Sequence, residues 1–210
     1  MQYVDLIRID HFNGFAKYWE VPIQDSDAAG GRWVRAKGIE LLEKLFKSNN
    51  KVNLIAEDLG EASADAAVLR NKYGIPGMNV LQFLFYDGDS IDNIEENTVL
   101  YTGTHDNDTS IGWFESLNSK LSSDEINDLK NILNSDSKGI NWSMIEYSFQ
   151  ARAKTVIVPV QDILGLGSDS RMNTPGTISE NNWSWRMDSS ELKDTMLRKM
   201  RDITEEANRA

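Results

Sequence analysis

Three short segments of this chain are apolar and extended, and each ends at a carboxylate. The segments are residues 4–10, 52–57 and 98–106. A parallel strand buried on both faces is apolar along its length, and α/β folds gather their functional groups at the carboxyl ends of such strands. The segments therefore predict an α/β fold with three carboxylates among its functional groups. Two carboxylates that face each other across a sugar are the basic apparatus for cleaving a glycosidic bond.

Strand and helix signals alternate along the chain, which is typical of a parallel sheet with crossover helices. Strands are expected at residues 4–10, 52–57, 78–84, 98–103 and 155–160. Helices are expected at residues 39–47, from a cap at Ser63 to Gly74, from the capping box of Ser122 and Glu125 to residue 134, from a cap at Asn141 to residue 153, and at residues 189–208. The segment after the first strand reads as an aromatic-rich loop. No linker divides the sequence, so residues 1–210 are expected to form one segment.

Composition narrows the class of partner. Hydrophobic residues are 40% and charged residues 26% of the chain, as in an ordinary globular domain. The net charge of −11 argues against nucleic acid and anionic membranes, which bind basic patches, and suits a neutral substrate. The chain has no Cys, which excludes a disulfide framework and a thiolate metal site. It shows neither a membrane-spanning apolar run nor a signal-peptide pattern, so the cytoplasm is the expected location.

Asp10 follows Arg8 by two residues, so both side chains leave the same face of the first strand. One interpretation is an ion pair that closes the strand end, which is common in α/β proteins. The other is a nucleophilic carboxylate kept ionised by the cation beside it. The spacing alone favours the ion pair.

Glu57 ends the second apolar strand and directly precedes Asp58. It is either an acid close to a helix, near the turn at Gly60, or a general acid at a strand end. In the second case it protonates a leaving oxygen and later deprotonates an incoming hydroxyl.

Asp106 lies in the motif THDND. One interpretation is an Asx turn, with Asp108 capping a helix that begins near Thr109. The other is a carboxylate that binds ring hydroxyls and stabilises an oxocarbenium-like transition state. The two histidines, His11 and His105, each adjoin a motif Asp, so a zinc site competes. The spacing HExxH, which would support zinc, is absent.

Eight short motifs follow one another along the chain. They are RIDHFNGFAKYWEVP at 8–22, GRW at 31–33, IAEDLG at 55–60, PGMNVLQFLFYDG at 76–88, YTGTHDNDT at 101–109, PVQDILGLG at 159–167, and RMNTPGT with NWSWR between 171 and 186. The ordered set resembles the amylomaltases, or 4-α-glucanotransferases, of glycoside hydrolase family 77, and the resemblance covers essentially the whole chain.

The resemblance implies a (β/α)8 barrel, for which 210 residues are short, because such barrels need about 250. The five expected strands then become strands four to eight, and the chain is the C-terminal portion of the barrel. The partners implied are α-1,4-glucans, maltooligosaccharides and the N-terminal half of the same enzyme.

The resemblance also assigns roles to individual residues. Asp10 becomes the nucleophile, Glu57 the acid/base and Asp106 the transition-state stabiliser. The implied substrate-binding residues are Arg8, His11, Asp58, Phe83, Asp87, His105 and Asn173. No metal or cofactor is implied. Gln161 and Asp162 are weaker candidates, since Asp162 is as well placed to cap a helix. Seven aromatic residues are considered together, most of them expected in the core and some as platforms on which glucose stacks: Trp19, Trp33, Phe83, Tyr86, Trp113, Trp183 and Trp185.

The implied reaction is transfer of α-1,4-glucan segments between maltooligosaccharides by a retaining double displacement. The same carboxylates also serve an α-amylase-like hydrolase, so the motifs leave this alternative open. An inactive glucan-binding fragment is the third hypothesis, because the absent strands would supply half of the pocket.

Overall fold

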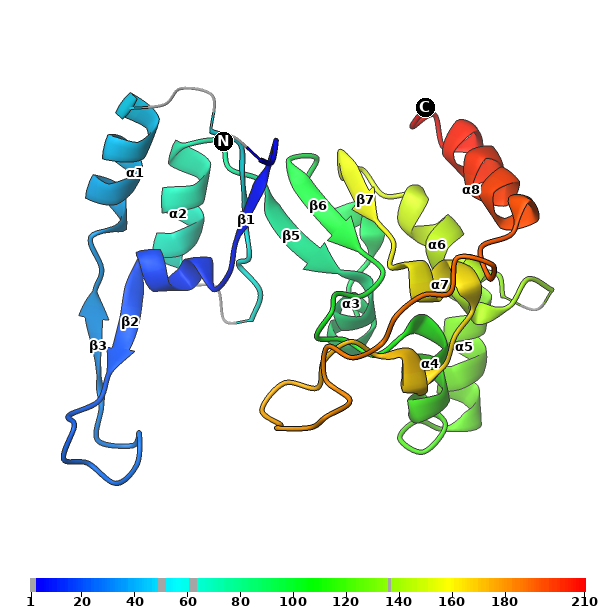
Figure 1. The fold of residues 1–210 in the computed structure, drawn as a ribbon, viewed down its shortest axis with the longest axis horizontal. Coiled ribbons are helices and arrows are strands. Elements are labelled where there is room, and N and C mark those ends of the chain that lie inside the picture. Colours follow the sequence, from blue (N-terminus) through cyan, green and yellow to red (C-terminus); the bar gives the residue numbers. More distant parts are fainter. Residues whose placement is uncertain (1–2, 49–51, 61–63, 136) are drawn as a thin grey trace. The chain divides into compact units, whose positions relative to one another are not determined.

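The computed structural model describes residues 3–48, 52–60, 64–135 and 137–210 of this α/β chain (Figure 1). The expected helix cap at Ser63 lies outside these residues. The backbone divides into two compact units. Unit 1 comprises Met1–Met78 and Asn97–Val99, and unit 2 comprises Asn79–Glu96 and Leu100–Ala210.

Unit 1 is built on two parallel strands, β1 (Ile7–Ile9) and β4 (Leu54–Ala56). In their register Arg8 lies opposite Ile55, and Ile9 lies opposite Ala56. Strand β4 is buried along its whole length, as its apolar sequence predicts. The other elements of unit 1 are η1 (Phe12–Phe15), β2 (Lys17–Glu20), β3 (Arg32–Arg35), α1 (Gly38–Ser48) and α2 (Ala64–Lys72).

The core of unit 1 lies between these strands and the two helices. Helix α1 forms where the apolar stripe predicts it, and its Leu42 is fully buried. The chain leaves α2 through Gly74, whose φ of 61° is the left-handed conformation that favours glycine. The core residues are Phe12, Ala16, Leu42, Leu54, Ala56, Ala66, Leu69 and Ile75.

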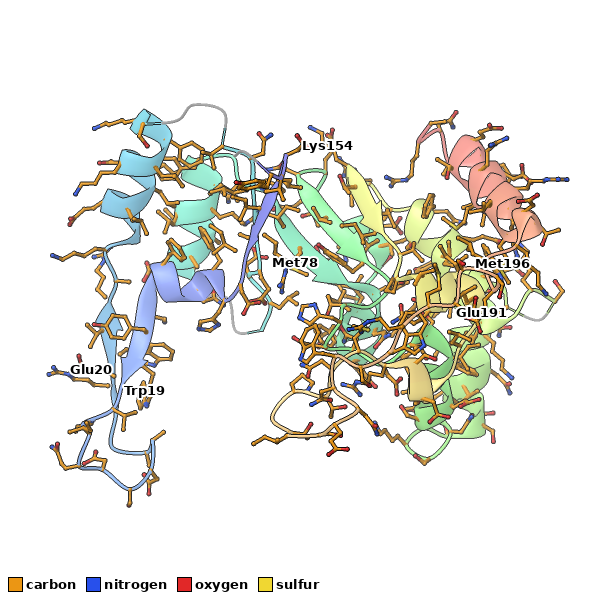
Figure 2. The ribbon with its side chains drawn as sticks, in the orientation of Figure 1. Trp19, Glu20, Met78, Lys154, Glu191 and Met196 are labelled. Atoms are coloured by element: carbon orange, nitrogen blue, oxygen red, sulfur yellow. The ribbon has the colours of Figure 1, made fainter. Side chains whose placement is uncertain are left out.

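The expected loop after the first strand is instead largely an antiparallel hairpin of β2 and β3. Trp19 lies opposite Trp33, and their rings meet edge to face with centroids 5.3 Å apart. Beside this pair, Glu20 forms an ion pair with Arg32 at 2.7 Å. Figure 2 labels Trp19 and Glu20, next to each other on β2. Cross-strand aromatic and charged pairs stabilise hairpins, and this pairing between distant residues is what the loop interpretation missed.

Unit 2 holds most of a three-stranded sheet with the order β5 (Gly77–Val80), β6 (Thr98–Tyr101), β7 (Thr155–Ile157). Strands β5 and β6 begin in unit 1 and end in unit 2. The helical elements are α3 (Leu81–Asp87), η2 (Ile91–Asn93), α4 (Ser110–Leu117), α5 (Ser123–Leu133), α6 (Ile140–Phe149), α7 (Val160–Leu164), η3 (Ser168–Ser170) and α8 (Asp194–Glu206).

The strand expected at residues 78–84 is wrong beyond Val80, because helix α3 starts at Leu81. A short apolar run fits a buried strand and a buried helix equally well. Here Leu81 and Leu84 lie on one helical face and are buried, and Gly88 ends the helix with a φ of 65°.

The helix ends test the capping predictions. The capping box of Ser122 and Glu125 is confirmed at the start of α5. The cap expected at Asn141 is wrong, because Gly139 precedes α6 and the Asn141 side chain donates to the Asp162 carbonyl at 2.8 Å. Helix α6 also ends at Phe149 rather than near residue 153.

The main core of unit 2 packs around helices α3, α4, α5 and α6. Its largest members include Leu81, Leu100, Trp113, Leu129 and Met144. A second cluster joins α6 to α8 through Ile145, Phe149 and Ile203. Across the residues that the structure describes, no helix has the length and apolar character needed to span a bilayer.

Candidate active site

Asp10 and Glu57 occupy matching positions at the ends of the paired strands β1 and β4. Because Ile9 lies opposite Ala56, the residues that follow them leave the sheet side by side. The Glu57 amide donates to the Ile9 carbonyl at 2.8 Å, which continues the pairing past the last strand residue. Unit 1 therefore places two carboxylate residues next to each other at the carboxyl edge of a parallel pair, as the sequence predicts.

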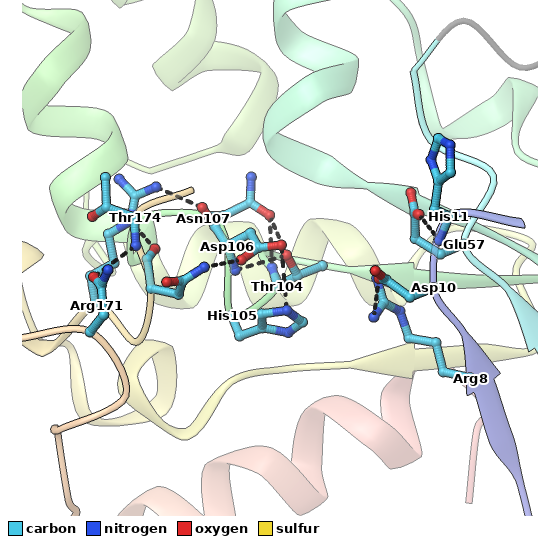
Figure 3. Close-up of polar contacts among 12 residues, drawn as sticks. Arg8, Asp10, His11, Glu57, Thr104, His105, Asp106, Asn107, Arg171 and Thr174 are labelled. Carbon is cyan, nitrogen blue, oxygen red and sulfur yellow. Dashed lines mark hydrogen bonds and ion pairs between the residues drawn. The ribbon is translucent and has the colours of Figure 1, made fainter. Parts of the chain in front are cut away.

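The Asp10 side chain is open to solvent and has a cation beside it. Arg8 Nη1 lies 3.0 Å from Asp10 Oδ1, and the two side chains are 27% and 78% exposed. Figure 3 shows this Arg8–Asp10 pair. The Arg8 Nε also donates to Met78 Sδ at 3.5 Å, which helps to orient the guanidinium. The predicted ion pair is confirmed, and it leaves most of the carboxylate accessible.

Glu57 is held by backbone amides on both sides. Its Oε2 accepts from the His11 amide at 2.6 Å, and its Oε1 accepts from the Leu59 amide at 3.1 Å. His11 has a φ of 45°, a conformation uncommon for a residue other than glycine. The unusual turn after Asp10 thus aims the His11 amide at Glu57 and fixes the relation between the two strand ends.

Asp58 was expected to bind substrate, but the structure gives it an internal role. Its Oδ2 lies 3.0 Å from Arg70 Nε, with both side chains largely buried, and its Oδ1 accepts from the Met78 amide at 3.0 Å. Gly77 leaves the room for this carboxylate, because a Cβ there would lie 2.6 Å from Asp58 Oδ2. Asp58 therefore connects β4, α2 and β5 through these contacts.

Asp106 lies in the loop between β6 and α4 of unit 2, surrounded by polar partners. Asn173 Nδ2 donates to its Oδ1 at 2.6 Å, and His105 Nε2 lies 3.4 Å from its Oδ2. Its backbone is also held, since Arg171 Nη2 donates to the Asp106 carbonyl at 2.6 Å and the Asp106 amide donates to Thr104 Oγ1 at 3.2 Å. The carboxylate is thus oriented by groups from its own loop and from the segment near residue 171 (Figure 3).

The segment around Arg171 fits closely against this loop. Arg171 Nε donates to the Asn173 carbonyl at 2.7 Å, and the Asn173 amide donates to the His105 carbonyl at 3.0 Å. The ring of Trp183 lies 5.1 Å from that of His105. Arg171 was not among the sequence candidates, and Trp183 was one of seven aromatic residues of which most were expected in the core; at 52% exposed it is not a core residue. Their motifs were visible, but nothing local shows that they meet residues 105 and 106.

Asp162, a weaker candidate, is only 1% exposed and ties three segments of unit 2 together. Its carboxylate accepts from Thr102 Oγ1 at 2.6 Å and from the Ser110 amide at 2.7 Å. Burial raises the pKa of Asp162, the hydrogen bonds from Thr102 and Ser110 act against this rise, and the nearby Asp108 charge adds to it. Asp162 therefore braces the ends of the loop that carries Asp106.

The expected cap of α4 by Asp108 is wrong. Thr109 is the N-cap residue, and its hydroxyl accepts from the Gly112 amide at 3.1 Å. Asp108 accepts instead from the Thr109 amide and from Ser168 Oγ, both at 2.8 Å. The capping role considered for Asp162 is real but acts on α4, because Asp162 accepts from the first amide of that helix.

The remaining predicted contacts lie on helix α3. Phe83 is 40% exposed, and Asp87, one helical turn further on, is also exposed. Residues four apart share a helix face, so these two side chains form part of one accessible surface. In the part of the chain that the structure describes, no group of three or more His, Asp or Glu residues is arranged to hold a metal ion.

The fold and these groups define an α/β protein with carboxylates at the carboxyl ends of its strands. The family described as 4-alpha-glucanotransferase matches residues 1–192, and this chain therefore belongs to that family. The predicted resemblance is confirmed.

Similar proteins agree with this assignment. The 4-alpha-glucanotransferase of Synechocystis is 42% identical over 98% of this chain and 41% of its own length, and the chloroplastic/amyloplastic enzyme of Solanum tuberosum is 44% identical over 95% of this chain and 35% of its own length. A solved amylomaltase from Streptococcus agalactiae, in complex with acarbose, superposes with a TM-score of 0.89 at 36% identity, covering 98% of this chain and 42% of that one. The chain thus spans about two fifths of the length of these relatives.

Proposed function

We propose that this chain carries the catalytic carboxylates of a 4-α-glucanotransferase, which moves α-1,4-glucan segments between maltooligosaccharides. The match to the family over residues 1–192 is the observation that carries the proposal. The register of β1 and β4 supports it, because it brings Asp10 and Glu57 to adjacent strand ends.

In the proposed reaction Asp10 attacks the anomeric carbon of the donor glucan. Glu57 gives a proton to the departing oxygen, so the bond between the two sugars breaks as the bond to Asp10 forms. The 4-hydroxyl of an acceptor then attacks the glucosyl ester, its proton passes to Glu57, and Asp10 leaves. The two inversions restore the α configuration. The carboxyl groups of the pair should lie about 5–5.5 Å apart in the working site, as retaining enzymes require.

The other residues have supporting roles in this scheme. Arg8 holds the Asp10 carboxylate, and Asp106 stabilises positive charge on the sugar ring in the transition state. His11, His105, Phe83 and Asp87 remain proposed substrate contacts. Asn173 binds Asp106 directly, so we assign it first to orienting that carboxylate.

We further propose that the five strands β1, β4, β5, β6 and β7 are strands four to eight of a (β/α)8 barrel. Backbone bonds support this order: Ala56 donates to the Pro76 carbonyl just before β5, and Thr102 donates to the Ile157 carbonyl in β7. The N-terminal half of the enzyme would supply strands one to three. Among the described strands, β1 pairs with β4 alone, which leaves its other edge open for such a partner.

The test compares this chain alone with the reconstituted enzyme, meaning this chain refolded together with the segment that supplies strands one to three. Given maltotriose, the reconstituted enzyme should release glucose together with chains longer than maltotriose. The chain alone should give no measurable transfer, because an open cleft admits water and loosens the site, and a misplacement near 1 Å costs about 10²-fold.

Chromatography of the products distinguishes the alternatives. If every product is shorter than maltotriose, the enzyme is an α-amylase-like hydrolase and not a transferase. No turnover after refolding, with maltooligosaccharide binding retained, would favour a glucan-binding fragment. Robust transfer by the chain alone, as a monomer, would reject the need for the other half.

A further inference from the structure

Trp183 has a backbone conformation that its side chain does not favour. Its φ is 63°, in the left-handed region. Glycine and asparagine enter that region readily, whereas a bulky residue there is an outlier. Such conformations persist only where the surrounding structure imposes them, and they gather at functional sites.

The surrounding loop imposes this conformation on Trp183. The Trp183 amide donates to the Met172 carbonyl at 2.6 Å, and the Trp183 carbonyl accepts from Arg186 Nη1 at 2.9 Å. Met172 lies between Arg171 and Asn173, the two residues that bind Asp106. The loop that holds Asp106 therefore also fixes the position of Trp183.

The indole ring does not serve the core of unit 2. Trp183 is 52% exposed, and its ring lies 5.1 Å from the His105 ring at an interplanar angle of 39°. His105 is in turn 3.4 Å from the Asp106 carboxylate. An ordinary packing role would bury the indole, since aromatic side chains contribute to stability chiefly through the area they bury. Instead the loop holds an accessible aromatic surface close to the carboxylate of the candidate site.

We propose that Trp183 contacts the substrate, with its exposed indole face stacking on a glucosyl unit bound beside Asp106. The apolar face of a glucose ring fits a flat aromatic surface, and neither group needs a charge. His105 and Asp106 then take the hydroxyls at the edge of the same ring. The inference rests on the proposed function, because it takes the ligand of that site to be a glucan.

The kinetic test uses Trp183→Ala and Trp183→Phe in the reconstituted enzyme. Aromatic contacts contribute enough that loss of the ring should raise KM for maltotriose about 3- to 10-fold, with kcat changing less. Phe keeps a flat ring and should recover most of the affinity. The matched control is Trp142→Phe on α6, whose ring lies 4.3 Å from Lys199 Nζ and packs against the Ile145 cluster, so its KM should match that of the unsubstituted enzyme.

A second measurement needs only this chain. Its six Trp residues each give an indole N–H signal in a nitrogen–proton NMR spectrum, and Trp183→Phe identifies one of them by its loss. That signal should shift when maltoheptaose is added, while the Trp142 signal stays in place.

Two results would overturn the role of Trp183. One is an unshifted Trp183 signal while other signals report maltoheptaose binding. The other is a fall in kcat at constant KM, which would make Trp183 only a positioning residue for His105. Both are distinct from failure of the proposed function, in which the unsubstituted reconstituted enzyme transfers no glucosyl units from maltotriose.

Discussion

Asp10 in unit 1 and Asp106 in unit 2 are held in very different ways. The Asp10 side chain is 78% exposed and has an ion pair with Arg8, from its own strand. The Asp106 side chain is 43% exposed and is oriented by His105 and Asn173, while Arg171 holds its backbone. Unit 2 therefore preorganises its carboxylate by itself, whereas the Asp10 carboxylate in unit 1 is held by an ion pair and stays largely exposed.

The difference follows from how each site is built. The site in unit 1 rests on strand register, which places two backbones side by side but leaves the Asp10 side chain free to respond to its surroundings. In unit 2 the loop that carries Asp106 is held by hydrogen bonds to Asp162 and from the segment at residues 171–183. Preorganised dipoles around a charge stabilise a transition state, and hydrogen bonds from the surrounding residues keep those dipoles in place.

The largest expected effect comes from Asp10→Asn in the reconstituted enzyme. Asparagine has nearly the same shape but cannot form the glucosyl ester, so kcat should fall on the order of 10⁴-fold or more. Affinity for maltooligosaccharides, measured by calorimetry, should stay close to that of the unsubstituted enzyme. Near-normal turnover of this variant would reject Asp10 as the nucleophile and remove the basis for comparing it with Asp106.

The second-largest effect is expected at Asp162, which links the two ends of the loop that carries Asp106. Asp162→Ala leaves the Thr102 hydroxyl and the Ser110 amide as buried donors without their partner. Each unsatisfied donor costs about 1–3 kcal/mol, so the free energy of unfolding should fall by about 2–6 kcal/mol in urea titrations. Hydrogen exchange should show the loss in α4 and the loop before it, with unit 1 protected as before.

Asp162→Asn is the matched control, because its amide oxygen still accepts from Ser110, and it also tests the pH dependence. Since the folded state raises the pKa of Asp162, it holds the proton more tightly than the unfolded chain does. The stability that the folded state gains from this tighter proton binding is fully present below the pKa of the unfolded chain, about 3.9. It is lost as the pH rises through the higher pKa of the folded state. The difference in stability between the unsubstituted protein and Asp162→Asn should change between the unfolded and the folded pKa of Asp162, and it should be constant at higher pH. Parallel profiles would contradict the raised pKa.

The smallest effect is expected at Gly77 in unit 1. The added Cβ of Gly77→Ala would lie 2.6 Å from Asp58 Oδ2 and must displace the carboxylate from Arg70 or from the Met78 amide. Overpacking of this kind costs about 1–3 kcal/mol, and the loss should appear in the hydrogen exchange of β4 and α2.

Gly167→Ala in unit 2 is the control for that change, because a Cβ at Gly167 meets open space and its φ of −83° suits any residue. Equal stability of Gly77→Ala and Gly167→Ala would show that the bond network of Asp58 does not hold unit 1 together.

The sequence by itself determined the local features of this protein. The apolar runs before Asp10, Glu57 and Asp106 predicted the strands β1, β4 and β6. Strands β4 and β6 are buried as such runs suggest, whereas Ile7 in β1 is 40% exposed. The stripe at residues 39–47 and the capping box at Ser122 likewise predicted α1 and the start of α5. Each of these signals acts between residues at most a few positions apart.

Only the tertiary structure decided which distant groups meet. In the folded chain residues 81–87 form a helix, Trp19 pairs with Trp33 across two strands, and Asp58 forms an ion pair with Arg70. The tertiary structure also brought Arg171 to Asp106, 65 residues away, and Asp162 to Thr102, 60 residues away. A buried donor or carboxylate must find a partner wherever the fold offers one, and that choice depends on how the elements pack, which no local pattern of residues encodes.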